Sequence, residues 1–398
     1  MKPELAPAIV PGIRFAGVSA GIKSAVGALD LGLIVADRPS AAAAVFTENR
    51  IKAAPVRIAA ERIKAGRLQA ILANSGCANS FTGRPGMQLA RESCVHVARL
   101  IGCSPALVAP CSTGVIGHLY DLGKFKAGAE AAAQSLGADR MGDFARAIMT
   151  TDTRPKVAST RIHAGGATIT IAGACKGVGM IAPHMATMLA FIATDAAVSP
   201  AVLKRSLKSA LPHSFNAITV DSDMSTNDTA IIMASGAADN SKFGVRDQAA
   251  FDRAVGEVAT ALARELVSDG EGATKLVTVD VRGARSAADA ERVARAIADS
   301  PLVKTAFFGA DPNVGRIMMA AGKSGANVDP DRLVLSIGGV KVASGGRLLV
   351  EALPQAGEAM REREFAVRLD LRLGKASAVI LTCDLSYEYV KINAEYTT

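Results

Sequence analysis

Apolar and polar residues alternate with period two in several short stretches of the chain. The pattern is clear at 168–171, 277–281 and 367–373, and it is typical of strands with one buried face. Residues 70–73 form a short apolar run that ends in Asn74-Ser75-Gly76, as a strand does when it enters a turn. These stretches predict at least four strands.

Other stretches have the helical period. Apolar residues recur at helical spacing from Met87 to Ile101, after a break at Gly83–Gly86, and again along 251–266 and 290–297. The second of these helices is expected to stop at Ser268-Asp269-Gly270. Since strands and helices interleave, the chain predicts an α/β fold with layers of helices against mixed sheets.

The pattern restarts after Lys275, which suggests a domain boundary. The chain has 398 residues and 49% hydrophobic content, enough for two or three domain-sized cores. We therefore expect one α/β domain at 1–276 and a C-terminal α/β domain at 277–398.

Composition excludes several classes of protein. The net charge is +8, but basic residues are dispersed and do not alternate with aromatic ones, so no nucleic-acid partner is expected. The chain lacks both an apolar signal core and the roughly 18 apolar residues of a membrane span. Its six cysteines form no C-x-x-C pair, so no zinc site is expected. A soluble, cytoplasmic protein is the expectation.

Candidate chemistry lies in the segment CKGVGMIAPHMATMLAFIATD at 175–195. Its first half is rich in Gly and Pro, and its second half, from Thr187 to Ala193, is a continuous apolar run suited to a buried strand. A cut between Ala186 and Thr187 would leave a threonine as a new N-terminus held by that strand. From the pattern alone, an ordinary threonine at the start of a strand is the better explanation of the segment.

An N-terminal threonine supplies both a nucleophile and a base. Its hydroxyl is a weak nucleophile, but its own α-amine, with a reference pKa of about 7.7–8.0, can accept the hydroxyl proton near neutral pH. Before the cut, the same hydroxyl can attack the Ala186 carbonyl and form an ester that water hydrolyses. The neighbouring His184 is expected to be a turn residue without a catalytic role.

The segment KGVGMIAPHMATMLAF resembles the cleavage site of the ornithine acetyltransferase/glutamate N-acetyltransferase family of arginine biosynthesis. Matching blocks continue in the family's order along the whole chain: AAAAVFTENRIKAAPV, NSGCANSFTG, CSTGVIG, TTDTRPK, VDSDMSTNDT, DGEGATK, GADPNVGRI and INAEYTT.

The resemblance implies a role for each matching residue. Thr187 would be the nucleophile, borne by the 1–276 domain, Ala186/Thr187 the cleavage site, and Thr113 with Gly114 the oxyanion hole. The positions that contact substrate in the family are Thr153, Lys176, Thr187, Glu271, Asn393 and Thr398. A lysine suits a substrate carboxylate and a glutamate suits an ammonium.

The reaction implied is a ping-pong transfer of acetyl from N2-acetyl-L-ornithine to L-glutamate through an acetyl-threonine ester. The resemblance implies no metal and no organic cofactor. It also implies an N-terminal-nucleophile, aminopeptidase-like fold with a smaller C-terminal domain whose tail docks at the active site, and an α2β2 assembly of the two cleaved chains.

Six positions depart from the family pattern: Cys77, Val178, His184, Ser222, Met224 and Val314. They leave open a paralogous transferase for another N-acyl amino acid. An amide hydrolase or aminopeptidase with the same nucleophile also fits the sequence, as does an uncleaved regulatory or binding protein. Whether acetyl-CoA serves as a second donor is also open.

Overall fold

One long strand organises the larger part of the molecule. The computed structural model describes residues 3–182 and 188–395. Within them, residues 3–182, 188–216 and 223–266 form unit 1, and residues 217–222 and 267–395 form unit 2. In unit 1 the strand β2 (Leu31–Phe46) belongs to an eight-stranded sheet of order β4-β3-β2-β8-β7-β6-β5, with β1 beside β2. The domain boundary expected at residue 276 stays a prediction.

The strands of unit 1 belong to two sheet layers joined by β2. The first half of β2 pairs with β1 and β3, its second half pairs with β8, and the register shifts between Val35 and Ser40. The pairs β3–β4 and β7–β8 are parallel, and the other neighbours are antiparallel. The remaining strands are β1 (Ile13–Val18), β3 (Arg67–Asn74), β4 (Val108–Ser112), β5 (Lys156–Ala164), β6 (Ala167–Lys176), β7 (Leu189–Thr194) and β8 (Thr229–Ala234).

Alternate side chains of the strands build two cores. Ile34 and Ile71 from the first layer share one cluster with Phe191 and Ile231 from the second, so this core fills the space between the layers. The helices of unit 1 are α1 (Ala54–Arg62), α2 (Gly83–Ile101), α3 (Leu122–Gln134), α4 (Met141–Ala147), α5 (Pro200–Ala210) and α6 (Val245–Ser268).

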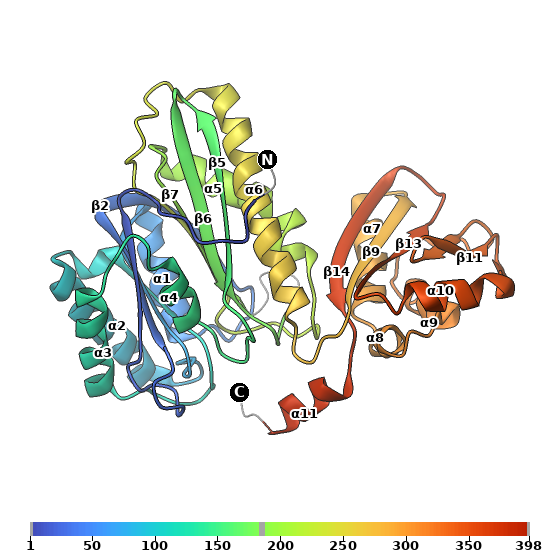
Figure 1. Ribbon diagram of the computed structural model, residues 1–398, viewed down its shortest axis with the longest axis horizontal. Helices are drawn as coiled ribbons and strands as arrows, with labels where there is room; N and C mark the ends of the chain where they lie inside the picture. Colours follow the sequence, from blue (N-terminus) through green and yellow to red (C-terminus); the bar gives the residue numbers. More distant parts are fainter. Residues whose placement is uncertain (1–2, 183–187, 396–398) are drawn as a thin grey trace. The chain divides into compact units, whose positions relative to one another are not determined.

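Helices cover the outer faces of both layers. Leu31 and Leu33, which alternate with Ile34, pack with Val97 of α2 and Phe125 of α3 on the outside of the first layer. The helices α5 and α6 lie along the second layer (Figure 1), where the Cys175 Sγ of β6 is 3.7 Å from the Leu262 carbonyl oxygen of α6. Unit 1 therefore has four layers, in the order helix, sheet, sheet, helix.

The helix predicted after Gly83–Gly86 begins earlier than expected. The structure has α2 from Gly83, so both glycines lie inside its first turn. A Cβ on Gly86 would be 1.9 Å from the Thr82 Oγ1, so this glycine permits a close approach and does not break the helix. By contrast, α6 ends at Ser268 as predicted, and its predicted apolar face is fully buried.

Unit 2 is a smaller α/β body around a six-stranded sheet of order β12-β11-β10-β13-β9-β14. The strands are β9 (Leu276–Ala284), β10 (Val334–Ile337), β11 (Val340–Ser344), β12 (Arg347–Leu348), β13 (Glu364–Asp370) and β14 (Ala376–Cys383). The helices are α7 (Ala287–Ala298), α8 (Pro301–Phe308), α9 (Val314–Gly322), α10 (Leu353–Ala359) and α11 (Tyr387–Glu395). Short 3-10 turns of the two units are Ile63–Ala65, Pro105–Leu107, Leu211–His213, Phe215–Ala217 and Val350–Ala352.

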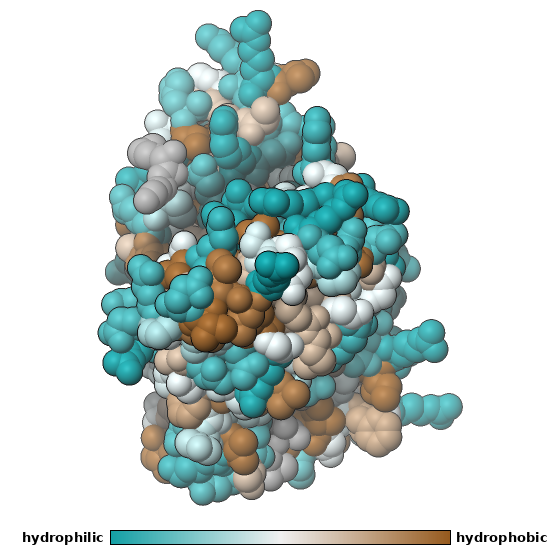
Figure 2. Space-filling model, turned by 90° about the vertical axis from the view of Figure 1, so that its right-hand side faces the viewer, coloured by the Kyte–Doolittle hydropathy of each residue, from teal (hydrophilic) through white to brown (hydrophobic). Residues whose placement is uncertain are grey.

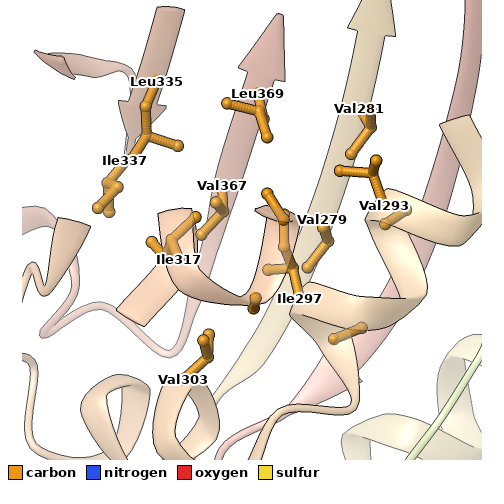
Figure 3. Close-up of a cluster of buried hydrophobic side chains, with 14 of the residues drawn as sticks. Val279, Val281, Val293, Ile297, Val303, Ile317, Leu335, Ile337, Val367 and Leu369 are labelled. Carbon is orange, nitrogen blue, oxygen red and sulfur yellow. The ribbon is translucent and has the colours of Figure 1, made fainter. Parts of the chain in front are cut away.

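The predicted alternation explains the core of unit 2. Val279 and Val281 of β9 and Val367 of β13 are fully buried, and Figure 3 shows them against Val293 and Ile297 of α7. The polar residues between them face the other side of the sheet, where Arg368 pairs with Asp280 at 2.9 Å. The period-two prediction at 277–281 is confirmed, and the one at 367–373 is confirmed as far as Asp370, where β13 ends.

The face in Figure 2 is mostly hydrophilic and carries one compact hydrophobic area near its middle. No helix within the described ranges is long and apolar enough to cross a membrane.

Candidate active site

Two parallel strands of the first layer end side by side in tight turns. Asn74, the last residue of β3, pairs in register with Ser112, the last residue of β4. The Ser112 hydroxyl donates to the Asn74 Oδ1 at 2.6 Å, and the Asn74 amide donates to the Cys77 carbonyl oxygen at 2.9 Å. These bonds fix the main chain that leads into the predicted oxyanion residues, Thr113 and Gly114.

Gly114 has a backbone that other residues rarely adopt. Its φ is +123°, and a Cβ there would lie 2.4 Å from the Gly76 carbonyl carbon. The main-chain amides on either side are bonded, from Thr113 to the Asn74 carbonyl oxygen (3.0 Å) and from Val115 to the Gly76 carbonyl oxygen (3.4 Å). Within the part of the chain that the structure describes, the Gly114 amide donates to no acceptor. The turn therefore presents one unused N–H group.

Lys176 reaches this turn from the second layer. It is the last residue of β6, it is 3% exposed, and its ammonium donates to the Thr113 Oγ1 at 2.8 Å. Because the Thr113 oxygen accepts this charged bond, its own hydrogen is left to donate elsewhere, and the nearby cation makes it a stronger donor. Thr113 and Gly114 thus offer two donors beside a buried positive charge.

Asp152 places a buried negative charge near the Lys176 ammonium. The Lys156 ammonium donates to the Asp152 Oδ1 at 2.6 Å, and the Gly177 amide donates to the same oxygen at 2.9 Å. Burial favours the neutral acid, but the Lys156 and Lys176 cations outweigh it and hold the pKa of Asp152 below its usual range. The pattern of the sequence did not single out Asp152. Its position next to the predicted Thr153 was the only signal.

The predicted nucleophile and cleavage site, Thr187 and Ala186, lie outside the described residues. The described chain resumes at Met188, followed at once by β7, as the apolar run predicted. Leu189 pairs with both Lys176 and Thr229, so β7 begins at the edge of the layer where β6 ends with Lys176. Met188 is held twice, since its amide donates to the Asp228 Oδ1 (3.0 Å) and its carbonyl oxygen accepts the Thr229 amide (3.1 Å).

Two of the predicted substrate contacts lie together in unit 2. The Asn393 side chain of α11 donates to the Glu271 Oε2 at 2.8 Å. Glu271 is 8% exposed and lies in the loop between α6 and β9. Thr153, in unit 1, is exposed, and Thr398 is not among the described residues.

The described residues do not include a cluster suited to a metal. Across 3–182 and 188–395, His, Cys, Asp and Glu side chains form no group of three that could hold an ion.

The comparisons with known proteins cover both units. A sequence model of the ArgJ family matches residues 14–398. The arginine biosynthesis bifunctional protein ArgJ of Geobacter sulfurreducens is 51% identical over 392 residues, 98% of this chain and 100% of that protein. The protein of the same name from Symbiobacterium thermophilum is 45% identical over 390 residues, 97% of each chain. A solved chain of Bacillus halodurans ArgJ is 36% identical with a TM-score of 0.49, and the match covers 52% of this chain and 98% of that one.

Proposed function

Because this chain belongs to the ArgJ family, we propose that it transfers acetyl from N2-acetyl-L-ornithine to L-glutamate through an ester on Thr187. The enzyme is an acetyltransferase of arginine biosynthesis, like the relatives that match its full length. Family membership and the layered architecture also confirm the predicted fold class, an α/β fold of the N-terminal-nucleophile type with a smaller C-terminal α/β unit.

One observation gives the mechanism its main support: the turn at Thr113 and Gly114 holds two donors that bind no acceptor among the described residues, and it lies beside the Lys176 ammonium. Attack on an acetyl carbonyl creates a negative oxygen, and donors fixed in advance around that oxygen are a large part of enzymatic rate enhancement. Lys176 is almost fully buried, so its charge acts through a medium that screens it weakly. We propose that Lys176 polarises this oxyanion hole as well as contacting substrate.

Maturation would precede transfer. The Thr187 hydroxyl attacks the Ala186 carbonyl, the peptide nitrogen of Thr187 leaves as an amine, and water hydrolyses the ester. The products are residues 1–186 and 187–398. The freed amine then takes the hydroxyl proton when Thr187 attacks N-acetylornithine. Ornithine leaves with a proton on its nitrogen, and the amine of glutamate attacks the acetyl ester to give N-acetylglutamate and restore Thr187.

The remaining roles rest on the family pattern. We propose that Thr153, Glu271, Asn393 and Thr398 contact the amino-acid parts of the substrates, with Glu271 suited to an ammonium group. We also propose the α2β2 assembly of cleaved chains and leave acetyl-CoA as a possible second donor for the assay to decide.

Mass spectrometry with single substrates tests the proposal. Purified protein should consist of two fragments that meet at Ala186/Thr187, and N-acetylornithine alone should add one acetyl group to Thr187 and release ornithine. Glutamate should then remove that group as N-acetylglutamate. The control, Thr187→Ala, should remain one chain of 40.8 kDa and form no ester.

Three results would contradict the proposal. Cutting of the Thr187→Ala variant at the same bond would assign maturation to a protease. Steady ornithine release without glutamate would make the enzyme a hydrolase. Activity confined to another N-acyl amino acid would make it a paralogous transferase.

A further inference from the structure

Asn227 and Asp228 stand directly before β8 and belong to neither the nucleophile nor the oxyanion turn. They lie in the block VDSDMSTNDT, which the proposed mechanism does not use. Their exposed fractions are 5% and 0%. Adjacent residues of an extended segment project in opposite directions, so each side chain has its own surroundings.

Asn227 fixes the oxyanion turn. Its side-chain amide donates to the Ala78 carbonyl oxygen at 2.7 Å and to the Ser112 carbonyl oxygen at 2.8 Å. Ser112 immediately precedes Thr113. The Asn227 side-chain amide, which belongs to the second layer, therefore joins the turn after β3 to the turn after β4.

Asp228 fixes the other side of the proposed site. Its Oδ1 accepts the Met188 amide at 3.0 Å, and Met188 is bonded to Thr187 through a peptide. Its Oδ2 is buried and has no hydrogen-bond partner among the described residues. The nearby Thr47 hydroxyl does not fill this position, because it donates to the Ser225 carbonyl oxygen at 2.7 Å.

Covalent geometry shows what the second oxygen can reach. Three bonds separate the Thr187 nitrogen from the Met188 nitrogen, which keeps the two atoms within about 4 Å in any backbone conformation. Before maturation the Thr187 nitrogen is part of a peptide. After the cut it is an amine with up to three hydrogens. A carboxyl that binds the Met188 amide therefore acts on the residue that directly follows that amine in the chain.

We propose that Asp228 is a positioning residue: its carboxyl holds the Met188 amide and the freed Thr187 amine together, and Asn227 holds the oxyanion turn at the matching distance. This inference rests on the proposed function of Thr187. It adds that one dipeptide at the start of β8 sets the geometry between the nucleophile and the oxyanion donors, for maturation and for acetyl transfer.

The charge of Asp228 links position to protonation. Burial raises the pKa of Asp228 well above its usual range, and the Met188 amide and the Lys176 ammonium offset part of this effect. Among the described residues, Lys176 is the charged side chain that acts on this carboxyl. In the mature enzyme, an Asp228 that passes its proton to the Thr187 amine would be negative and would favour the ammonium form of Thr187, which cannot act as a base.

The decisive variant is Asp228→Asn, with Asp195→Asn as its matched control. Asp195 is also a buried acid with a pKa raised by burial, and its Oδ1 also accepts a main-chain amide, from Thr170 at 2.8 Å. It lies beyond the far end of β7. Asn at 228 keeps an oxygen for the Met188 amide but carries no negative charge.

We expect Asp228→Asn to lower kcat by about 10- to 100-fold with a small change in KM, and to shift the acidic limb of the kcat/KM profile to lower pH. Asp228→Ala, which loses both oxygens, should slow maturation more than Asp228→Asn does. If Asp228→Asn matures too slowly for kcat to be measured, the cleavage rate of its folded precursor, compared with that of the wild type, replaces kcat as the readout. Asp195→Asn should keep the wild-type cleavage rate and pH profile.

An Asp228→Asn enzyme whose kcat, pH profile and cleavage rate equal those of Asp195→Asn would overturn the inference. The proposed function has a separate readout, the acetyl ester on Thr187 of the wild-type enzyme. If that ester forms while Asp228→Asn behaves as wild type, the positioning role alone fails. If the ester never forms, the proposed function fails first.

Discussion

At the scale of single residues, Gly114 illustrates how the site constrains its own sequence. The position combines a φ of +123° with a 2.4 Å approach of any Cβ to Gly76. Gly117, three residues on, has a φ of +85° but nothing within 4 Å of a Cβ. A side chain at 117 would therefore cost only backbone strain, whereas a side chain at 114 would cost both backbone strain and a steric collision.

Gly114→Ala should displace the oxyanion turn, whereas Gly117→Ala should only strain the backbone. Strain of this kind costs roughly 1–2 kcal/mol, and the collision at 114 should add about 1–3 kcal/mol more. We expect kcat to fall about 10²- to 10³-fold in Gly114→Ala, as when one oxyanion donor is lost, and to stay near wild type in Gly117→Ala. Thermal unfolding and steady-state kinetics measure both effects, and equal kcat values in the two variants would exclude Gly114 from the oxyanion hole.

At the scale of elements, the end of β14 determines the shape of the loop that carries Glu271. The Asp384 Oδ1 accepts the amides of Thr274 and Lys275, both at 2.8 Å, and its Oδ2 accepts the Thr274 hydroxyl at 2.6 Å. The Ser386 hydroxyl donates to the Gly272 carbonyl oxygen at 2.6 Å. A strand and a loop far apart in sequence are thus joined by a carboxylate that is 2% exposed.

Asp384→Ala should loosen this loop and raise the KM for N-acetylornithine by about tenfold or more, because the three hydrogen bonds disappear together. Asp370→Ala is the matched control, since Asp370 ends β13 of the same sheet and accepts one main-chain amide, from Arg372 at 3.0 Å. Its KM should stay within about twofold of wild type. An unchanged KM in folded Asp384→Ala protein would separate Glu271 from substrate binding.

At the scale of the whole molecule, Asp228 should reduce stability as pH rises. Its folded-state pKa is raised by burial, whereas an unfolded Asp titrates near about 3.9. Below that pH both states hold the proton and Asp228 has no effect. Above it the unfolded chain loses the proton and the folded chain keeps it, so stability falls until the pH passes the folded pKa.

Asp228→Asn should therefore be more stable than Asp228 near pH 7 and equal to it near pH 3. The comparison is best made in a Thr187→Ala background, where one covalent chain unfolds. Melting temperatures measured across this pH range provide the test. A variant that is destabilised equally at both pH values would show that Asp228 contributes packing and not a buried, costly charge. A gain in stability with a loss in kcat is typical of residues kept for function.

The sequence by itself determined the elements whose pattern is local. The valines of β9 and the apolar face of α6 follow directly from period-two and period-3.6 spacing, since burial of one face requires that spacing. The predicted start of α2 was wrong because Gly86 is needed for the close approach of Thr82 and does not break the helix. The spacing of apolar residues does not reveal such a contact. Motif blocks gave Thr113, Gly114, Lys176 and Glu271 as candidates through resemblance.

Only the tertiary structure decided how those candidates meet. Lys176 touches Thr113 because β6 and β4 end at neighbouring positions in different sheet layers, and the layers are joined by a register shift in β2. Neither fact is visible in a local pattern. In the sequence, Asp228 is one of several acids in a polar block. The structure distinguishes it because it is fully buried and accepts the Met188 amide. Hydrophobic periodicity depends on near neighbours, whereas hydrogen bonds and buried charges depend on residues brought together by long-range pairing.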